Sequence, residues 1–187
     1  MNAQPAVAAE KLADPPSRYV SRKNQMKIEF EKITAPYCYP VSSADAKQIL
    51  NECIPTEILP KIIRLHFGCN QQTTQEARIV GRGSSFEVRI NFCPKDGKTK
   101  LLSEKRDWSS IVELCGGSID RVAQLVAWKP DSARTYAAFL IAHEIAHIAY
   151  AERNGSSKFN GSKSSASEEA WCDSFAKEAL RKLKAST

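Results

Sequence analysis

The clearest pattern of hydrophobic and polar positions lies at residues 86–90, FEVRI, where apolar and charged side chains alternate strictly. A period of two residues is typical of a strand with one buried face. Two further segments rich in apolar residues, 62–67 and 77–80, predict other strands. The residues CPKDG at 93–97 then predict a turn, because Pro, Asp and Gly favour tight turns.

The second half of the chain follows a helical period instead. Over residues 132–150 the apolar positions recur every three or four residues and predict a helix with a broad apolar face. Residues 118–128 predict a shorter helix that Pro130 ends, and residues 166–183 predict a last helix. Nearer the N-terminus, Ser43 is expected to cap a helix that continues to Cys53.

This order of elements, strands first and helices afterwards, predicts an α+β fold in which a small mixed sheet packs on a helical core. Residues 1–17 are rich in Ala and Pro without periodicity, and predict a disordered tail. Residues 18–187 then predict a single domain, which their number favours. Residues 153–165 are rich in Gly, Ser, Asn and Lys, and predict a mobile loop between the last two helices.

The composition of the chain indicates where the protein is located and which partners it is expected to have. No apolar run approaches the about 18 residues that a membrane span needs, so no contact with a membrane is expected. The N-terminus lacks the basic and apolar segments of a signal peptide, which predicts a cytoplasmic location. The net charge of +6 suits an acidic partner. However, the basic residues form no block and no known nucleic-acid-binding motif is present, which leaves nucleic acid an unsupported partner.

Six cysteines are spread along the chain, and no two of them form a CxxC pair. A zinc knuckle built from thiolates is therefore not expected. We expect most of the cysteines to be reduced, small core residues, while disulfides stay open if the protein is exported. The six are Cys38, Cys53, Cys69, Cys93, Cys115 and Cys172.

The candidate chemistry begins with the segment HEIAH, from His143 to His147. Positions i and i+4 of a helix share a face, so both imidazoles can reach one metal ion. Glu144 follows the first histidine and is placed to act on a water bound to that ion. The simpler interpretation is a helix with two ordinary histidines, but the neighbours are apolar, and buried histidines need partners. The segment therefore predicts a zinc site with Glu144 as its catalytic base.

A catalytic zinc site takes three protein ligands and keeps one position open. In the segment EEAWCDSFA, Glu169 and Asp173 are four residues apart and share a helix face. We therefore predict Glu169 as the third ligand, and Asp173 as a carboxylate that orients a ligating histidine. Glu168 lies outside this register and is expected to matter little. His66, the remaining histidine, is the alternative third ligand, and an acidic first turn favoured by the helix dipole is the interpretation without metal.

Taken together, HEIAH and EAWCDSFA resemble the gluzincin metallopeptidases, in which a Glu of an ExxxD helix completes the zinc site. They are most similar to small bacterial or phage-type HExxH domains of the cytoplasm. The resemblance covers roughly residues 78–180, although only the two helical motifs are specific, and Cys172 stands where a small Ala is usual. It implies a metallopeptidase core with Zn²⁺, a protein or peptide substrate, and a base at Glu144. The implied ligands are His143, His147 and Glu169, with Asp173 behind them.

The resemblance also implies that the strand at 86–92 is an edge strand that pairs with extended substrate. Two other functions stay open: a hydrolase of a non-peptide bond, and a regulatory or interaction protein with structural zinc. A structural site usually closes with a fourth ligand and needs no carboxylate beside the first histidine, so Glu144 favours catalysis. The group that stabilises the oxyanion is open among Tyr136, Tyr150, His66 and several arginines.

Overall fold

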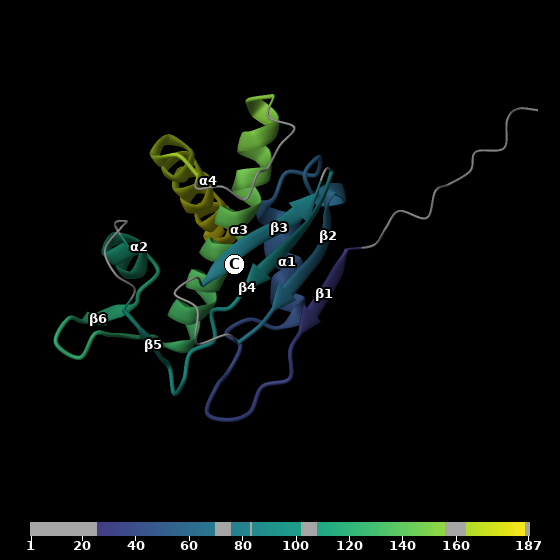
Figure 1. Cartoon of the computed structure of the whole chain (residues 1–187). Helices are drawn as coiled ribbons and strands as arrows, with labels where there is room; N and C mark the ends of the chain where they lie inside the picture. Colours follow the sequence, from purple (N-terminus) through teal and green to yellow (C-terminus); the bar gives the residue numbers. More distant parts are fainter. Residues whose placement is uncertain (1–25, 70–75, 83, 102–107, 156–163, 186–187) are drawn as a thin grey trace, which may run out of the picture.

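The computed structural model describes residues 26–69, 76–82, 84–101, 108–155 and 164–185. These residues form four α-helices, a four-stranded sheet and a three-stranded sheet, which confirms the α+β class (Figure 1). The predicted tail at 1–17 lies outside the described residues. Among the helices of the described part, none combines the length and the apolar character that a membrane crossing requires.

The larger sheet is mixed, as the sequence predicts. Its strands are β1 (Lys27–Phe30), β2 (Ile62–Phe67), β3 (Ala77–Arg82) and β4 (Ser85–Ile90). Their order across the sheet is β1-β2-β4-β3, in which the first three run parallel and β3 is antiparallel to β4. The strands expected at 62–67, 77–80 and 86–90 are confirmed. β1 is absent from the sequence-based prediction, because four residues carry too short a pattern to recognise.

One prediction about this sheet is wrong. The strand at 86–92 is expected at an edge, but β4 pairs with β2 on one side and with β3 on the other. Within the described residues, the edge strands are β1 and β3, and β3 is the one that lies next to β4. Alternation along a strand reveals which face is buried, and it carries no information about which strands become its neighbours.

The smaller sheet contains β5 (Lys98–Lys100), β6 (Ser118–Asp120) and β7 (Leu125–Ala127) in the antiparallel order β5-β7-β6. A short helix, α2 (Trp108–Leu114), packs against β6. The turn predicted at 93–97 leads into β5 and is confirmed. Its two central residues, Asp96 and Gly97, both have positive φ (49° and 69°), which is typical of a two-residue hairpin turn.

The helix predicted over 118–128 is wrong, because this segment is the hairpin of β6 and β7. The Asp120 carboxylate accepts hydrogen bonds from the backbone N–H of Val122 and Ala123 (3.0 and 2.8 Å), which turns the chain after three residues. Local bonds of this kind compete with helix formation. Pro130 does not end a helix but begins one, at the first position, where its missing N–H costs no hydrogen bond.

Three longer helices carry the rest of the fold: α1 (Ser43–Cys53), α3 (Pro130–Arg153) and α4 (Ala166–Ala185). They confirm the helices expected at 43–53, 132–150 and 166–183. The cap of α1 is one residue earlier than predicted. The Ser42 hydroxyl accepts from Asp45 N, and the Asp45 carboxylate accepts from Ser42 N (3.1 and 2.8 Å), a reciprocal capping box. Most of the loop expected at 153–165 lies outside the described residues.

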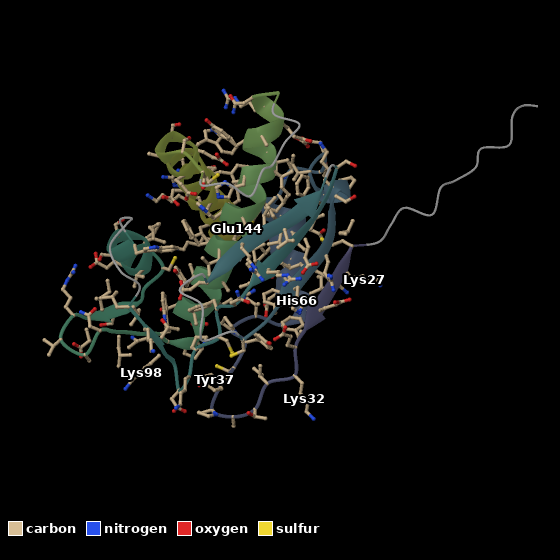
Figure 2. The ribbon with its side chains drawn as sticks, in the orientation of Figure 1. Lys27, Lys32, Tyr37, His66, Lys98 and Glu144 are labelled. Carbon is tan, nitrogen blue, oxygen red and sulfur yellow. The ribbon has the colours of Figure 1, made fainter. Side chains whose placement is uncertain are left out.

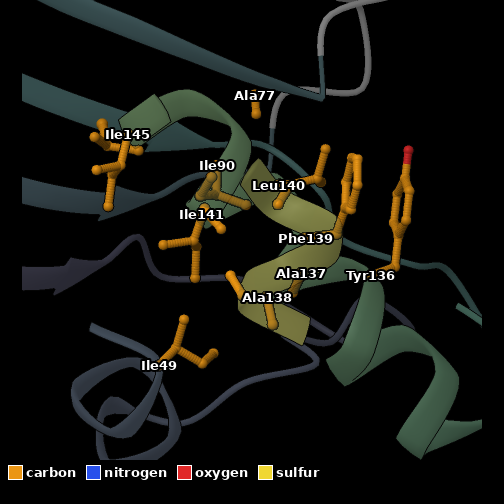
Figure 3. Close-up of a cluster of buried hydrophobic side chains, with 14 of the residues drawn as sticks. Ile49, Ala77, Ile90, Tyr136, Ala137, Ala138, Phe139, Leu140, Ile141 and Ile145 are labelled. Atoms are coloured by element: carbon orange, nitrogen blue, oxygen red, sulfur yellow. The ribbon is translucent and has the colours of Figure 1, made fainter. Parts of the chain in front are cut away.

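A single cluster of buried apolar side chains joins the helices to one face of the larger sheet. Helix α3 contributes the most to it and lies between the sheet and α4, while α1 contacts both α3 and α4. Figure 3 shows Leu140, Ile141 and Ile145 of α3 pointing into the same core as Ile90 of β4 and Ile49 of α1. Packing on three sides fixes the position and rotation of α3, and therefore the direction of its polar side chains.

Candidate metal centre

Two histidines of α3 lie one turn apart in the middle of the helix. His143 and His147 are 3% and 6% exposed, and their ring centroids are 5.0 Å apart. The ring of Phe139, one turn earlier, stacks on His143 at 5.9 Å. Imidazoles this deeply buried need polar partners on both ring nitrogens, since an unpaired buried polar group is costly.

A carboxylate from α4 faces both rings. Glu169 Oε2 is 3.4 Å from His143 Nε2, and Glu169 Oε1 is 3.7 Å from His147 Nε2. The three side chains each offer one donor atom, and these atoms all lie within 4.8 Å of one another. The structure thus brings together the three residues that the sequence proposes as metal ligands.

The opposite nitrogen of each ring faces a second carboxylate of α4. Asp173 Oδ1 is 3.1 Å from His143 Nδ1, and Glu168 Oε1 is 2.8 Å from His147 Nδ1. Because a carboxylate oxygen accepts hydrogen bonds, these contacts favour the tautomer with the proton on each Nδ1, in which the Nε2 lone pairs face Glu169. Carboxylates in this position fix the tautomer and orientation of metal-binding histidines.

The contact of Glu168 corrects the expectation that this residue lies away from the site. Contacts of His143 with Asp173 and of His147 with Glu168 show that α3 and α4 pass each other in opposite directions. His147, one turn after His143 on α3, therefore contacts Glu168, which precedes Asp173 on α4. The sequence contained an indication of this role for Glu168. Each metal-binding histidine is expected to have a carboxylate partner on its other nitrogen, and Asp173 can be the partner of only one histidine.

The first turn of α4 is held by the serines that precede it. Ser165 Oγ accepts a hydrogen bond from Glu168 N at 3.1 Å, a side-chain cap at the start of the helix. The Ser164 hydroxyl donates to Glu169 Oε1, one of the two oxygens that face the histidines. Capping and this second contact hold Glu168 and Glu169 in place at a helix end that would otherwise fray.

The two contacts of Glu169 with the histidines are longer than direct hydrogen bonds and are compatible with a zinc ion between the three side chains. An N–H···O bond is normally about 2.7–3.2 Å long, and both contacts of Glu169 exceed this. Ligand atoms about 2.1 Å from a tetrahedral zinc lie about 3.4 Å from one another. Two imidazoles and one carboxylate are also a donor set found in catalytic zinc sites. The residues present therefore fit the metal that the sequence predicts.

Glu144 is half-buried on α3 and does not belong to the group of three donors. It follows His143 directly, so it projects from α3 about 100° around the helix from that residue. Figure 2 labels Glu144 on α3, which packs against both α4 and the edge strand β3. Glu144 is therefore outside the ligand set of this group, as a proton-transferring residue must be.

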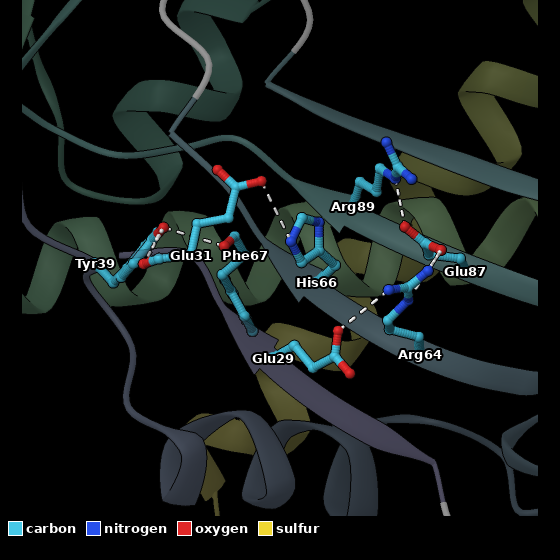
Figure 4. A network of polar contacts seen from close by, with 8 residues as sticks. All are labelled: Glu29, Glu31, Tyr39, Arg64, His66, Phe67, Glu87 and Arg89. Carbon is cyan, nitrogen blue, oxygen red and sulfur yellow. Dashed lines mark hydrogen bonds and ion pairs between the residues drawn. The ribbon is translucent and has the colours of Figure 1, made fainter. Parts of the chain in front are cut away.

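His66 lies on the other face of the sheet and is not part of the centre. Its neighbours Leu65 and Phe67 are fully buried towards the helices, so alternation directs His66 to the opposite side. There its Nε2 is 3.4 Å from Glu31 Oε1, next to a cross-strand network in which Arg64 pairs with Glu87 at 2.6 Å (Figure 4). The alternative of His66 as the third ligand, or as an oxyanion donor, is therefore wrong.

The Tyr136 hydroxyl is hydrogen-bonded to a residue outside the metal centre. This tyrosine lies two turns before His143, and its hydroxyl donates to Glu76 Oε2 at 2.5 Å. Burial raises the pKa of Glu76 to about 7. Phe92, Trp108 and Trp128 pack around the Tyr136 ring. Of the two tyrosines considered for the oxyanion, Tyr150 remains a candidate; it lies one turn after His147, and its ring packs against Trp171 of α4 at 5.5 Å.

Comparison with protein-family models, with curated proteins and with solved structures finds no match to this chain. The case for its function therefore rests on its own residues and their geometry.

Replacing Glu168 by Ala is expected to weaken zinc binding by about 10- to 100-fold, because His147 loses the carboxylate that orients it. Competition with a chromogenic chelator measures this affinity. The matched control is Glu178→Ala, a carboxylate further along α4 that is exposed and pairs with Arg181. Equal affinities in the two variants would show that Glu168 has no part in the centre.

Proposed function

We propose that this chain is a zinc-dependent metallopeptidase of the gluzincin type. The observation that carries the proposal is the convergence of His143, His147 and Glu169 donor atoms within 4.8 Å, with Glu144 next to His143 in sequence but outside the donor set. A centre with three protein ligands keeps one coordination position open, which catalytic zinc sites need and structural sites usually fill.

The protein residues divide the chemistry between them. Zinc, when bound, polarises the carbonyl of the scissile bond and makes water more acidic. Glu144 takes a proton from the attacking water and delivers it to the leaving nitrogen. Asp173 and Glu168 keep the imidazoles in one tautomer, so that their Nε2 atoms face the metal position throughout. Tyr150 is the candidate donor to the developing oxyanion.

The edge strand β3 supports a peptide as the substrate. Its outer side has no partner strand among the described residues, and it packs against α3, the helix that carries Glu144. An extended peptide can add to such an edge by main-chain hydrogen bonds. This role belongs to β3, and not to the 86–92 strand that the sequence indicates.

The direct test is metal analysis of the purified protein, followed by a proteome-derived peptide library with and without chelator. We expect about one zinc per chain, and cleavage that chelation stops and added zinc restores. Zinc at full occupancy with no peptide cleaved would favour a structural centre or a non-peptide substrate. Cleavage that chelators leave unchanged would exclude the proposed mechanism.

A further inference from the structure

Three of the cysteines follow neighbouring strands of the larger sheet. Cys38 follows the end of β1 by eight residues, Cys69 follows the end of β2 by two, and Cys93 follows the end of β4 by three. Because β1, β2 and β4 are parallel neighbours, their carboxyl ends meet at the same end of the sheet. The topology therefore gathers thiols that are well separated along the chain, at a place distinct from the metal-binding helices.

Backbone hydrogen bonds hold these segments together. Gly68 N donates to Ile90 O at 2.9 Å, which places the residue before Cys69 against the end of β4. Cys38 N donates to Pro94 O at 3.2 Å, and Cys38 Sγ is 3.8 Å from the same oxygen. Figure 2 shows sulfur atoms close to the labelled Tyr37, the residue before Cys38.

Two of the thiols are neighbours in this cluster. Burial first, and then the interaction with the Cys69 thiol, raise the pKa of Cys93. Tyr39 lies close to both: burial first, and then the charges of Cys93, Glu31 and Cys69, raise the pKa of its phenol to about 12. Cys93 is buried and Cys69 is half-buried, so of these two thiols Cys69 is the more accessible to a small molecule in solvent.

A pair suits this cluster better than a metal site does. Among the residues that the structure describes, the group of three donors within 4.8 Å is the one at His143, and the three thiols do not form another. Cys53, Cys115 and Cys172 are buried, as expected of core residues, whereas Cys38 is exposed. The contact that remains to be explained is the one between Cys69 and Cys93.

We propose that Cys69 and Cys93 form a disulfide by exchange with a small-molecule disulfide. The Cys69 thiolate attacks one sulfur of that molecule, which forms a mixed disulfide and releases one small thiol. Cys93, deprotonated as it reacts, attacks the Cys69 sulfur and releases the second small thiol. The two protein thiols lose two electrons and two protons, and the small-molecule disulfide gains them.

The bond would join the carboxyl ends of β2 and β4. It would close a loop that contains β3 and β4, the two strands between the cysteines. Closing such a loop restricts the unfolded chain, so oxidised protein is expected to melt at a higher temperature than reduced protein.

The test uses the purified protein with all 187 residues, incubated with oxidised glutathione. After the free thiols are blocked and the protein is digested, we expect a cross-linked peptide pair containing Cys69 and Cys93. Reactive thiols should fall by two of six, with a mass loss of about 2 Da for two hydrogens, and a reductant should reverse both. The same peptide map on untreated protein provides the reduced reference.

Two variants sharpen the test. Cys69→Ser should lose the cross-link and keep all its remaining thiols reactive, whereas the matched control Cys38→Ser should keep the cross-link. A cross-link that contains Cys38, a stable mixed disulfide at Cys69 that never resolves, or no loss of thiols would each overturn the proposal. If a variant fails to fold, the peptide map of the unaltered protein, before and after oxidation, decides between these outcomes.

Discussion

Replacing Glu144 by Gln is expected to lower turnover by at least about a hundredfold while the protein keeps its zinc. The amide preserves the size of the side chain and its ability to hydrogen-bond, but it cannot accept the proton of the attacking water. Glu144 lies outside the group of three donor atoms, so its loss leaves the proposed ligands unchanged. Initial rates on a library-derived peptide, with zinc content measured on the same samples, check both halves of the prediction.

The matched control for this variant is Glu178→Gln, which removes a carboxylate from the exposed part of α4. It should retain wild-type turnover and zinc. A metal-loaded Glu144→Gln protein that turns over at the wild-type rate would remove Glu144 from the chemistry. It would then favour the interpretation of a structural zinc in a regulatory or interaction protein.

Replacing both His143 and His147 by Ala is expected to reduce zinc from about one per chain to a background level. The change removes two of the three donors and leaves Glu169 as a single carboxylate, which cannot retain the ion alone. Glu169→Ala should weaken binding strongly for the same reason. Elemental analysis of dialysed protein measures the occupancy, and circular dichroism establishes whether the variants still fold.

His66→Ala is the control for these variants, because it removes the chain's other histidine from the opposite face of the sheet. It should keep full zinc occupancy. Zinc that stays with the double variant, or that leaves with His66→Ala, would show that the ion binds elsewhere in the molecule.

The candidate centre is predictable from sequence to the extent that its spacing is local. His143 and His147 share a face of one helix, and Glu169 and Asp173 share a face of another, because both pairs are four residues apart. The carboxylate on His147 required more than spacing. Glu168 reaches that ring only because α4 runs opposite to α3, and the direction in which two helices pass is set by their packing.

The hairpin at 118–128 shows where local pattern misleads. Its apolar residues are compatible with a helical face, but Asp120 binds the backbone two and three residues onward and reverses the chain. β6 and β7 then pair with each other, and β7 also pairs with β5, contacts that no helical pattern foretells. The secondary structure of short segments with a mixed pattern depends on the elements that they pack against in the folded chain.

By itself, the sequence determined the long helices, the strand with alternating residues and the two motifs that contain the proposed ligands. Each of these depends on residues that are close to one another along the chain. Only the tertiary structure decided that β3, and not β4, lies at an edge of the sheet, that His66 faces away from the centre, and that Cys69 and Cys93 come near each other at the ends of β2 and β4. The physical reason is that strand order and helix packing minimise exposed apolar surface over the whole chain. The arrangement of strands and helices relative to one another therefore cannot be recognised from the pattern of residues in any single segment.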